Sequence, residues 1–318
     1  MNKIVFLNAA SINFDHQLDF SPITKLGTFT KYNDCNHDEI LEKVADQNVI
    51  ITKEVPLSKE LIEQFPSSVK LICEAGTGYN NIDLQAATSK GIRVCNIPGY
   101  STEAVAQLAI TFILNFSASI VHQQNMIERQ DYSNFTDHLQ VPHFELQNKT
   151  LGLIGTGAIG QQVMQIARTL GMNVLTYSRT PKDFNDPKIK SVSLDDLLKQ
   201  SDFVSIHCPL TDETKHLIDI DKLKLMKSTA FVINTSRGAI IKETDLIEAL
   251  KNKVIAGAGL DVQDPEPPRL DNPLFKMDHV ILTPHIGWKR LESRQRLVQL
   301  LSGNIESFIN DMPINVVN

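Results

Sequence analysis

The most informative part of the sequence is KTLGLIGTGAIGQQVMQIARTLGMNVLTYS, residues 149–178. It reads as a strand, the turn Gly155-x-Gly157-x-x-Gly160, a helix and a second strand, which is the setting that a dinucleotide-binding turn requires. Gly155 permits the tight turn, Gly157 lets the backbone approach a pyrophosphate, and Gly160 lets the helix pack on the strand. The helix N-terminus offers N–H donors and partial positive charge to phosphate. The apolar positions of the helix are Ile159, Val163, Ile166 and Leu170. The stretch therefore predicts NAD or NADP binding, the alternative being a glycine turn with a structural role only.

The residue after the second strand bears on which cofactor is bound. Dinucleotide-binding chains usually have Asp or Glu there, which bonds both ribose hydroxyls of NAD and repels the extra phosphate of NADP. Here the position is Ser178, which removes that repulsion, and Arg179, with Lys182 nearby, is suited to pair with a phosphate dianion. A charge-assisted hydrogen bond contributes about 1.5–3 kcal/mol, which shifts a preference by one or two powers of ten. The pattern favours NADP, and the alternative is a solvated Arg179 in a site that accepts both cofactors.

Length and composition fit a globular enzyme of two domains. The chain has 318 residues, of which 42% are hydrophobic and 21% charged, and its formal net charge of −6 without a long basic run predicts no nucleic-acid partner. No CxxC pair occurs among the cysteines, so we expect no metal site, no disulfide framework and a cytoplasmic location. They are Cys35, Cys73, Cys95 and Cys208. The apolar stretch 104–121 approaches transmembrane length, but polar residues interrupt it, and we expect a buried helix and no membrane span.

Short apolar runs alternate with helical patterns along the whole chain. In the first third the runs are 3–9, 48–53, 70–76 and 92–97, and further along they are 150–155, 173–178, 202–209, 230–236, 255–262 and 279–285. Such an alternation predicts parallel sheets with helices on both faces. Ten strands are many for one sheet, so we expect two doubly wound α/β domains. Helices are also expected after the capping sequence Ser101-Thr102-Glu103 and over residues 289–310.

Three of the later runs end in polar side chains with complementary chemistry. Arg237 follows the run 230–236, Glu266 lies in a proline-rich loop after 255–262, and His285 ends the run 279–285. Ligands of open α/β sheets bind beyond the carboxyl ends of the strands, so these residues are expected to face one cleft. Arg237 is suited to hold a carboxylate or carbonyl oxygen, and His285 to donate a proton to the oxygen as hydride reaches the carbon. Glu266 would orient the imidazole and favour its charged form.

Each of the three residues also has a plainer interpretation. Arg237 is alternatively a surface arginine at a helix N-terminus, Glu266 a solvated loop charge and His285 a structural histidine. Their joint placement after a dinucleotide-binding unit favours the catalytic interpretation. His207 also ends a strand, and we interpret it as structural or as lying near the cofactor, and not as the acid.

With these residues in place, the chain resembles the D-isomer-specific 2-hydroxyacid dehydrogenase family over nearly its whole length. The resemblance rests on motifs that occur in the family's order. They are EAGTGYNNIDL, GYSTEAVAQLAI, LGLIGTGAIG, HCPLTDETKHLI, NTSRGAIIKETDLIEAL, AGLDVQDPEP and TPHIGW. The resemblance implies that Arg237 binds and polarises the substrate and that Glu266 and His285 form the acid–base pair. The chain differs from the family pattern at Ser178, so the resemblance does not imply a preference for NAD.

The resemblance also implies the domain layout and further contacts. A flavodoxin-like substrate domain would comprise residues 1–100 and 288–318, and a Rossmann cofactor domain residues 101–287, with two chains joined as a homodimer. Predicted substrate contacts are Lys53, Thr77, Gly78, Arg237, His285 and Trp288. Predicted cofactor contacts are Val105, Gly155, Gly157, Ala158, Ile159, Gly160, Ser178, Arg179, Cys208, Pro209, Thr235, Ser236, Asp261 and Gly287.

Within the family, the sequences YSTEAVAQ and PHIGW resemble glycerate dehydrogenases, also called hydroxypyruvate or glyoxylate reductases. Trp288 would limit the size of the substrate or, equally, pack at the domain hinge. We therefore expect reduction of a small 2-ketoacid, hydroxypyruvate or glyoxylate. One alternative is a corepressor-like protein of the same fold that senses NAD(P), and another is a phosphite-type dehydrogenase. Formate dehydrogenases have Gln in place of the glutamate of the pair, whereas Glu266 is present here.

Overall fold

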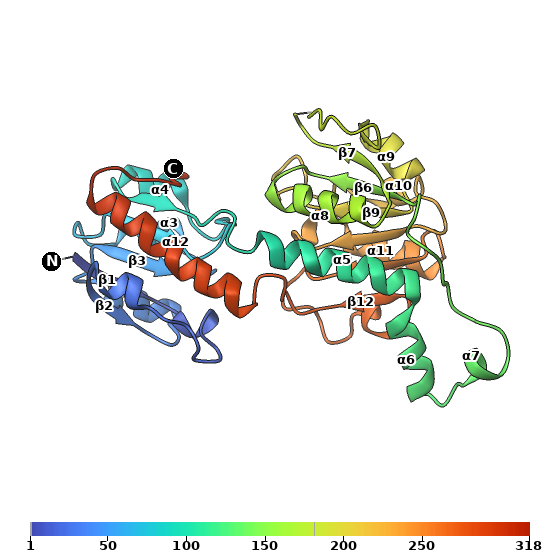
Figure 1. Ribbon diagram of the computed structural model, residues 1–318. Helices are drawn as coiled ribbons and strands as arrows, with labels where there is room; N and C mark the ends of the chain where they lie inside the picture. Colours follow the sequence, from blue (N-terminus) through green and yellow to red (C-terminus); the bar gives the residue numbers. More distant parts are fainter. Residues whose placement is uncertain (1, 181) are drawn as a thin grey trace. The chain divides into compact units, whose positions relative to one another are not determined.

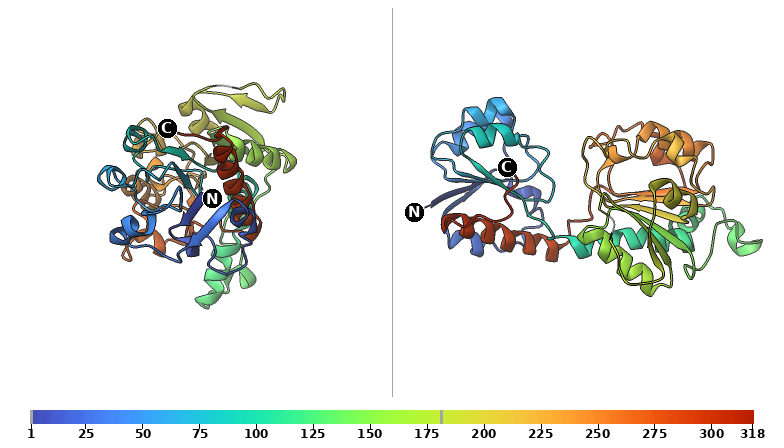
Figure 2. Two further views of the ribbon diagram at one scale, coloured as in Figure 1. Left: turned by 90° about the vertical axis from the view of Figure 1, so that its left-hand side faces the viewer. Right: turned by 90° about the horizontal axis from the view of Figure 1, so that it is seen from above.

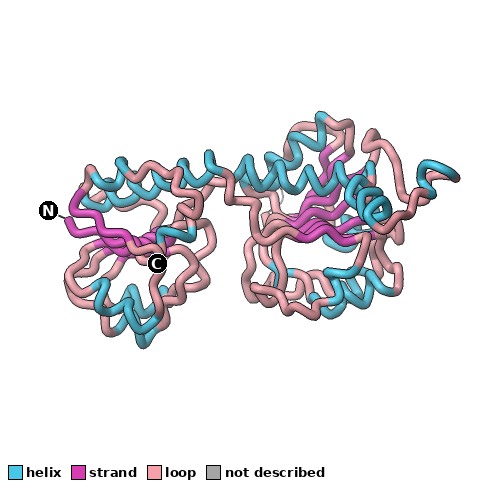
Figure 3. The backbone as a smooth tube through the Cα atoms, turned by 90° about the horizontal axis from the view of Figure 1, so that it is seen from below, coloured by secondary structure: helices cyan, strands magenta, loops and turns pink. Residues whose placement is uncertain are grey.

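A computed structural model describes residues 2–180 and 182–318 of the chain (Figure 1). The chain forms two compact units. Met1–Ser101 and Trp288–Asn318 form unit 1, and Thr102–Gly287 forms unit 2. Each unit has its own parallel sheet between two layers of helices (Figure 3). The chain is therefore an α/β protein with two doubly wound sheets, as its strand pattern predicts.

Unit 1 has the strand order of flavodoxin. Its five parallel strands are arranged β2-β1-β3-β4-β5. Their bounds are β1 (Asn2–Phe6), β2 (Gly27–Lys31), β3 (Val49–Thr52), β4 (Leu71–Glu74) and β5 (Arg93–Cys95). The helices are α1 (Ser21–Thr24), α2 (Ile40–Val44), α3 (Lys59–Glu63), α4 (Leu84–Ser89) and α12 (Leu291–Ile309), with short 3₁₀ turns at Ala9–Ser11 and His37–Glu39.

Alternation along β1 explains why both faces of this sheet are covered. Helix α12 lies along one face of the sheet (Figure 2). Ile4 and Phe6 join Leu297 of α12 in the core on that face. Val5 and Leu7 point to the opposite face and join a second core with α2, α3 and α4. These three residues of β1 and Leu7, which directly follows the strand, are fully buried. A strand buried on both faces has no polar alternation, which is why it reads as a continuous apolar run.

Unit 2 has a seven-stranded parallel sheet with the Rossmann order β12-β11-β10-β9-β6-β7-β8. Its strands are β6 (Thr150–Ile154), β7 (Asn173–Tyr177), β8 (Ile189–Ser191), β9 (Phe203–Ile206), β10 (Phe231–Asn234), β11 (Gly257–Leu260) and β12 (Val280–Leu282). Its helices are α5 (Thr102–Ala118), α6 (Ile120–Glu128), α7 (Ser133–Thr136), α8 (Ala158–Thr169), α9 (Leu194–Gln200), α10 (Ile220–Leu223) and α11 (Glu243–Lys251), with 3₁₀ turns at Gly238–Ile240 and Pro273–Lys276. Helices α5 and α8 share a core on one face, and α9, α10 and α11 cover the other.

The sequence prediction finds ten of the strands and misses two. The missed strands are β2 and β8, which lie at sheet edges. Their sequences, GTFTK and IKS, are largely exposed and polar, so they lack the apolar run that marks the central strands. Helix α12, at Leu291–Ile309, confirms the helix predicted over 289–310.

The apolar stretch 104–121 forms most of α5, whose buried residues include Val105, Ile113 and Phe116. The helix ends at Ser119, which has a left-handed φ of 50°, and α6 begins after it. In the described part of the chain no single helix has the length and apolarity to cross a membrane. The pair α5 and α6 meets that test only when taken together, and it is bent by 61°.

Candidate active site

The glycine turn of unit 2 lies at the point where the strand order reverses, between β6 and β9. Gly155 has a φ of +100°, and a Cβ there would lie 2.6 Å from the backbone nitrogen of Cys208. A Cβ on Gly160 would lie 2.2 Å from the carbonyl oxygen of Gly155. Both positions therefore exclude a side chain, one because of the turn and one because α8 begins directly against it.

Gly157 is different, because it borders open space. It is the N-cap of α8, it is exposed, and a Cβ there would meet no atom within 4 Å. The first N–H groups of the twelve-residue helix α8 follow it without a side-chain cap. These features fit a pyrophosphate, which needs close backbone approach and the positive end of a helix. Of the predicted apolar positions, Val163 is fully buried, whereas Ile159 and Ile166 are half-buried because Gly160 and Ala167 face the sheet.

The segment after β7 contains the residues predicted to select the cofactor. The Ser178 hydroxyl donates to the carbonyl oxygen of Thr180 at 2.8 Å, and Arg179 is exposed. The Lys182 ammonium donates to the carbonyl oxygen of Thr156, within the glycine turn, at 3.2 Å. Arg179 and Lys182 thus provide two cationic side chains here, and residues 178–180 contain no carboxylate.

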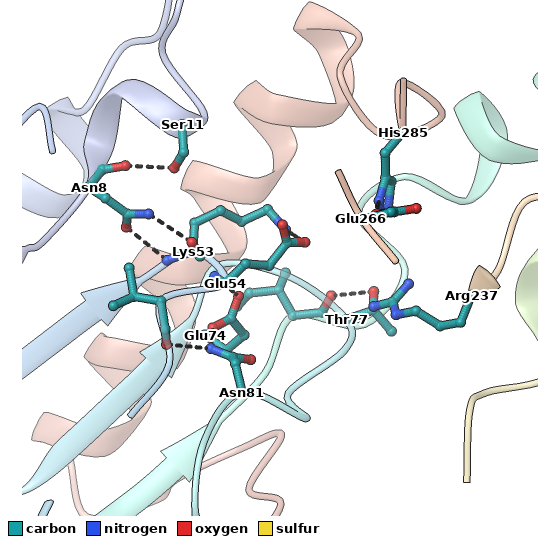
Figure 4. Close-up of polar contacts among 12 residues, drawn as sticks. Asn8, Ser11, Lys53, Glu54, Glu74, Thr77, Asn81, Arg237, Glu266 and His285 are labelled. Atoms are coloured by element: carbon teal, nitrogen blue, oxygen red, sulfur yellow. Dashed lines mark hydrogen bonds and ion pairs between the residues drawn. The ribbon is translucent and has the colours of Figure 1, made fainter. Parts of the chain in front are cut away.

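The three predicted catalytic residues lie on loops that follow β10, β11 and β12. His285 Nδ1 and Glu266 Oε2 are 2.9 Å apart, and Glu266 Oε1 accepts a hydrogen bond of 2.9 Å from the N–H of Gln263 (Figure 4). The Arg237 guanidinium donates to the carbonyl oxygen of Ser236 at 2.8 Å. Burial disfavours the charged form of Glu266, but the hydrogen bond and charge of His285, together with Arg237, hold the pKa of this carboxyl below its usual value.

Asp261 fixes the segment that presents His285. Its Oδ1 accepts from the Thr283 hydroxyl at 2.6 Å and from the N–H of Ile286 at 2.8 Å, while its Oδ2 accepts from the N–H of Gly287 at 2.8 Å. His285 has a φ of 51°, a conformation that costs a non-glycine residue about 1–3 kcal/mol. The buried carboxylate of Asp261 therefore supports a strained turn. The predicted contact of Asp261 with the cofactor remains a prediction.

Other predicted cofactor contacts surround the same strand ends. The Ser236 hydroxyl donates to the carbonyl oxygen of Cys208, which joins the loops after β9 and β10. Thr235 Oγ1 is buried and has no hydrogen-bond partner among the described residues, which fits its predicted contact with a polar group of the cofactor. Val105 lies beside Gly287, where its Cγ2 would be 3.3 Å from an added Cβ. Pro209 is exposed in the loop after β9.

His207 has a structural environment. Its Nε2 is 2.8 Å from the Ser205 hydroxyl, and burial lowers its pKa to about 4. A histidine with that pKa is neutral near pH 7, which fits the structural role expected for it and not that of a proton donor.

The predicted substrate contacts of unit 1 gather at the carboxyl ends of β3 and β4. The Lys53 ammonium lies 4.7 Å from the centre of the Trp288 ring, and Trp288 is buried in the core beneath α12. Thr77 donates from its hydroxyl to the carbonyl oxygen of Ile97 at 3.0 Å, and Gly78 is half-buried beside it. Sequence reasoning missed Glu74, whose buried carboxylate ends β4. The only signal for it was a charged residue closing the apolar run LICE.

The Rossmann unit, the glycine turn and the Glu266–His285 pair beside Arg237 define a nicotinamide-dependent oxidoreductase. Residues 110–287 match the family model described as D-isomer specific 2-hydroxyacid dehydrogenase, NAD binding domain. A hydroxypyruvate reductase of Blautia hydrogenotrophica is 36% identical over 99% of both chains. A glyoxylate reductase of Thermococcus litoralis is 41% identical over 88% of this chain and 86% of that protein.

A solved structure has a similar fold. An acyclic imino acid reductase, Bsp5, in complex with NADPH and D-Arg matches with a TM-score of 0.88 and 31% identity, over 99% of this chain and 100% of that one. The chain belongs to the D-isomer-specific 2-hydroxyacid dehydrogenase family. It is an oxidoreductase that acts on the CH–OH group of donors and uses a nicotinamide cofactor.

Proposed function

We propose that this enzyme reduces a small 2-ketoacid, hydroxypyruvate or glyoxylate, to the D-2-hydroxyacid. The observation that carries the proposal is the 2.9 Å contact between His285 Nδ1 and Glu266 Oε2, with Arg237 close enough to lower the pKa of Glu266. Relatives named hydroxypyruvate reductase and glyoxylate reductase support the choice of substrate.

In this proposal each residue has one task. When bound, the reduced nicotinamide supplies the hydride for the carbonyl carbon. Glu266 holds Nδ1 of His285, which leaves Nε2 to donate a proton to the carbonyl oxygen and to take it back in the oxidising direction. Arg237 holds a carboxylate or carbonyl oxygen with its planar guanidinium and polarises the carbonyl. Asp261 is a positioning residue, because its carboxylate accepts from the Thr283 hydroxyl before His285 and from the backbone N–H of Gly287 after it.

We propose that NADPH is preferred over NADH. Ser178 has no charge to repel a 2′-phosphate, and Arg179 is exposed and adjacent in sequence. Bsp5, which was solved in complex with NADPH, is a precedent for NADPH binding on a similar structure.

In unit 1 we propose that the backbone of Thr77 and Gly78, with Lys53, receives the substrate carboxylate and that Trp288 limits substrate size. The Lys53 side chain is only 4% exposed, and its ammonium lies over the Trp288 ring. A buried cation beside backbone donors is suited to a small anion and unsuited to a bulky apolar group.

We propose that the enzyme acts in the cytoplasm. We also propose that two copies associate through α5, α6 and α7. Large apolar side chains are exposed on these helices and on the segment that follows them, a density typical of an interface. They are Leu114, Ile120, Val121, Tyr132, Phe135 and Leu139. Sedimentation equilibrium is expected to give twice the 35.6 kDa of one chain, and Phe135→Glu, at a residue 76% exposed, is expected to yield monomers that stay folded.

Steady-state kinetics with hydroxypyruvate, glyoxylate, pyruvate and 2-ketoisocaproate, each with NADH and NADPH, tests the proposed reaction. We expect the highest kcat/KM for hydroxypyruvate or glyoxylate with NADPH. A bulky branched ketoacid as the best substrate would contradict the substrate assignment. NADPH binding without turnover of any ketoacid would favour the cofactor-sensing role, and turnover of phosphite alone would favour the phosphite-type dehydrogenase.

A further inference from the structure

A cluster of polar side chains lies at the carboxyl ends of β1, β3 and β4 in unit 1. It includes residues that have no role in the proposed reaction. The order β2-β1-β3 places the topological switch point of this sheet between β1 and β3, where open α/β sheets bind ligands. Asn8, after β1, brackets the peptide group of Lys53, after β3. Its Nδ2 donates to the Lys53 carbonyl oxygen at 2.7 Å, and its Oδ1 accepts from the Lys53 N–H at 3.0 Å. The backbone of Lys53 is thus fixed.

The Lys53 ammonium lies between an aromatic ring and a carboxylate. It packs over Trp288 at 4.7 Å and forms an ion pair with Glu54, whose side chain is 51% exposed. Glu54 has a left-handed φ of 60°, which turns the chain sharply at the end of β3. A methyl group added to Gly76 would lie 3.2 Å from Lys53 Nζ, so the ammonium also faces the loop after β4.

Glu74 joins the same two loops from the inside (Figure 4). It is completely buried, and its Oε1 accepts from the N–H of Glu54 at 3.0 Å. Its Oε2 accepts from Asn81 Nδ2 at 2.9 Å. The methyl group imagined on Gly76 would lie 3.4 Å from Glu74 Oε1, so this carboxylate and the Lys53 ammonium converge on one α-carbon.

The loop after β4 presents hydrogen-bond donors. Two of its carbonyl groups accept hydrogen bonds from the segment after β5. The N–H of Ile97 donates to the Gly76 oxygen at 2.8 Å, and Asn96 Nδ2 donates to the Thr77 oxygen at 2.8 Å. Within residues 2–180 and 182–318, the N–H groups of Thr77 and Gly78 donate to no protein acceptor. Backbone donors and a fixed ammonium together make a site for a small anion.

We propose that Glu74 is a positioning residue whose protonation sets the affinity of the Lys53–Gly78 site for carboxylates, so that binding of the substrate carboxylate is coupled to proton uptake by Glu74. This inference rests on the proposed function, because it takes the carboxylate to be that of the 2-ketoacid.

The charges around Glu74 give the direction of the effect. Burial raises the pKa of Glu74 to about 7, against the opposing influence of Lys53. When Glu74 is ionised, Lys53 faces two carboxylates, Glu54 and Glu74, and an incoming anion is repelled. When Glu74 is protonated, Lys53 and Glu54 balance each other. The other ionisable groups nearby are Cys73 on β4, whose pKa is raised by burial so that it stays neutral, and Lys289, 6.0 Å from the Trp288 ring.

Oxalate, a small anion that cannot be reduced by hydride, is a suitable probe with the whole protein saturated with NADP⁺. At an effective dielectric constant between that of protein and water, the repulsion between two carboxylates weakens binding by about fivefold between pH 6 and 8. Titration calorimetry is expected to show this weakening, with proton uptake at pH 7.5 when buffers of different ionisation enthalpy are compared. In Glu74→Gln the proton uptake and the part of the weakening due to Glu74 are expected to vanish, while the exposed control Glu63→Gln behaves as wild type.

Glu54→Gln provides a second variant at a half-exposed side chain. It removes one carboxylate from Lys53 and is expected to tighten oxalate binding at every pH while leaving the pH dependence in place. Equal pH dependence and equal proton uptake in wild type and Glu74→Gln would overturn the inference. Ketoacid turnover by the wild type is measured separately. Proton-linked oxalate binding without turnover would reject the proposed reaction, whereas turnover with oxalate binding that Glu74→Gln leaves unchanged would reject the role of Glu74.

Discussion

The Glu266 carboxylate serves two partners at once, the N–H of Gln263 and the ring of His285. Glu266→Gln keeps the size of the side chain but removes the charge that stabilises a protonated imidazole, and its amide cannot accept from both partners. General acid–base catalysis contributes about 10²–10⁴-fold, so we expect kcat to fall by about 100-fold. The KM for the cofactor is expected to change little. Measurements of kcat across pH 5–9 check this prediction.

Glu248→Gln is the matched control for that variant, because Glu248 is exposed on α11 of the same unit. We expect its kcat to match the wild type. If Glu266→Gln also retained kcat within twofold and kept the same pH profile, Glu266 would have no part in the proton transfer.

The residue that follows β7 is expected to determine which cofactor is preferred. Ser178→Asp places a carboxylate at the end of β7, where it repels a 2′-phosphate and accepts from the ribose hydroxyls of NADH. We expect the ratio of kcat/KM for NADPH to that for NADH to fall by about 10- to 100-fold, which corresponds to the strength of one charge-assisted hydrogen bond. Ser191→Asp, on the exposed strand β8 of the same sheet, is the control. An unchanged ratio in Ser178→Asp would mean that residue 178 does not select the cofactor.

The glycine turn gives a prediction at the scale of an element, because two of its glycines are required for different reasons. In Gly155→Ala the new methyl group meets the Cys208 backbone at 2.6 Å in a left-handed conformation, so we expect a loss of folding stability of several kcal/mol. In Gly157→Ala the methyl group enters open space at a φ of −71°, so the fold is expected to persist. Cofactor binding is expected to weaken instead, because the pyrophosphate must approach the backbone of residue 157 closely.

Thermal unfolding and cofactor binding separate the two variants. Gly155→Ala is expected to lower the melting temperature, and Gly157→Ala to leave it unchanged while raising the KM for NADPH by about tenfold. A Gly157→Ala enzyme with unaltered cofactor binding would contradict placement of the pyrophosphate at the start of α8.

The elements that the sequence predicts well are those with a local cause. The strand–turn–helix at 149–178 is predicted because three glycines and two apolar runs occur within one continuous segment. Strands β2 and β8 are missed because an edge strand is exposed and needs no apolar run. In α8 the periodicity identifies the helix but not its buried face, since that face includes the small residues Gly160 and Ala167.

At the scale of the whole molecule, the predictable part of the site is the part that motifs record. Arg237, Glu266 and His285 each follow a recognisable strand, so one rule about parallel sheets brings their loops together. Glu74 has no such signal. Its environment depends on Asn8, Lys53 and Asn81, which folding brings near it from three separate loops. Burial created by such long-range packing cannot be inferred from the residues on either side of Glu74.

That burial has a consequence for the stability of the fold. The pKa of Glu74 is raised from 4.5 to about 7 in the folded protein, so ionising this carboxyl is harder in the folded than in the unfolded chain. Glu74 is completely buried. The loss of stability caused by its ionisation is therefore absent below pH 4.5, grows as the pH rises toward 7, and is nearly constant above that. The free energy of unfolding is expected to lose about 3 kcal/mol from this group between pH 4.5 and pH 8.

Glu74→Gln isolates this contribution, since an amide does not titrate. Any hydrogen bond that the amide fails to make with Asn81 or with the Glu54 N–H shifts the stability by a constant and leaves its pH slope unaffected. Trp288 is the sole tryptophan of the chain and is buried in unit 1, so its fluorescence during urea denaturation reports the unfolding of the unit that contains Glu74. The stability of wild type minus that of the variant is expected to fall steadily from pH 5 to pH 7 and to level off above it. A difference that stays constant across this range would mean that Glu74 ionises as easily in the folded protein as in the unfolded one, and would contradict the rise of its pKa on burial.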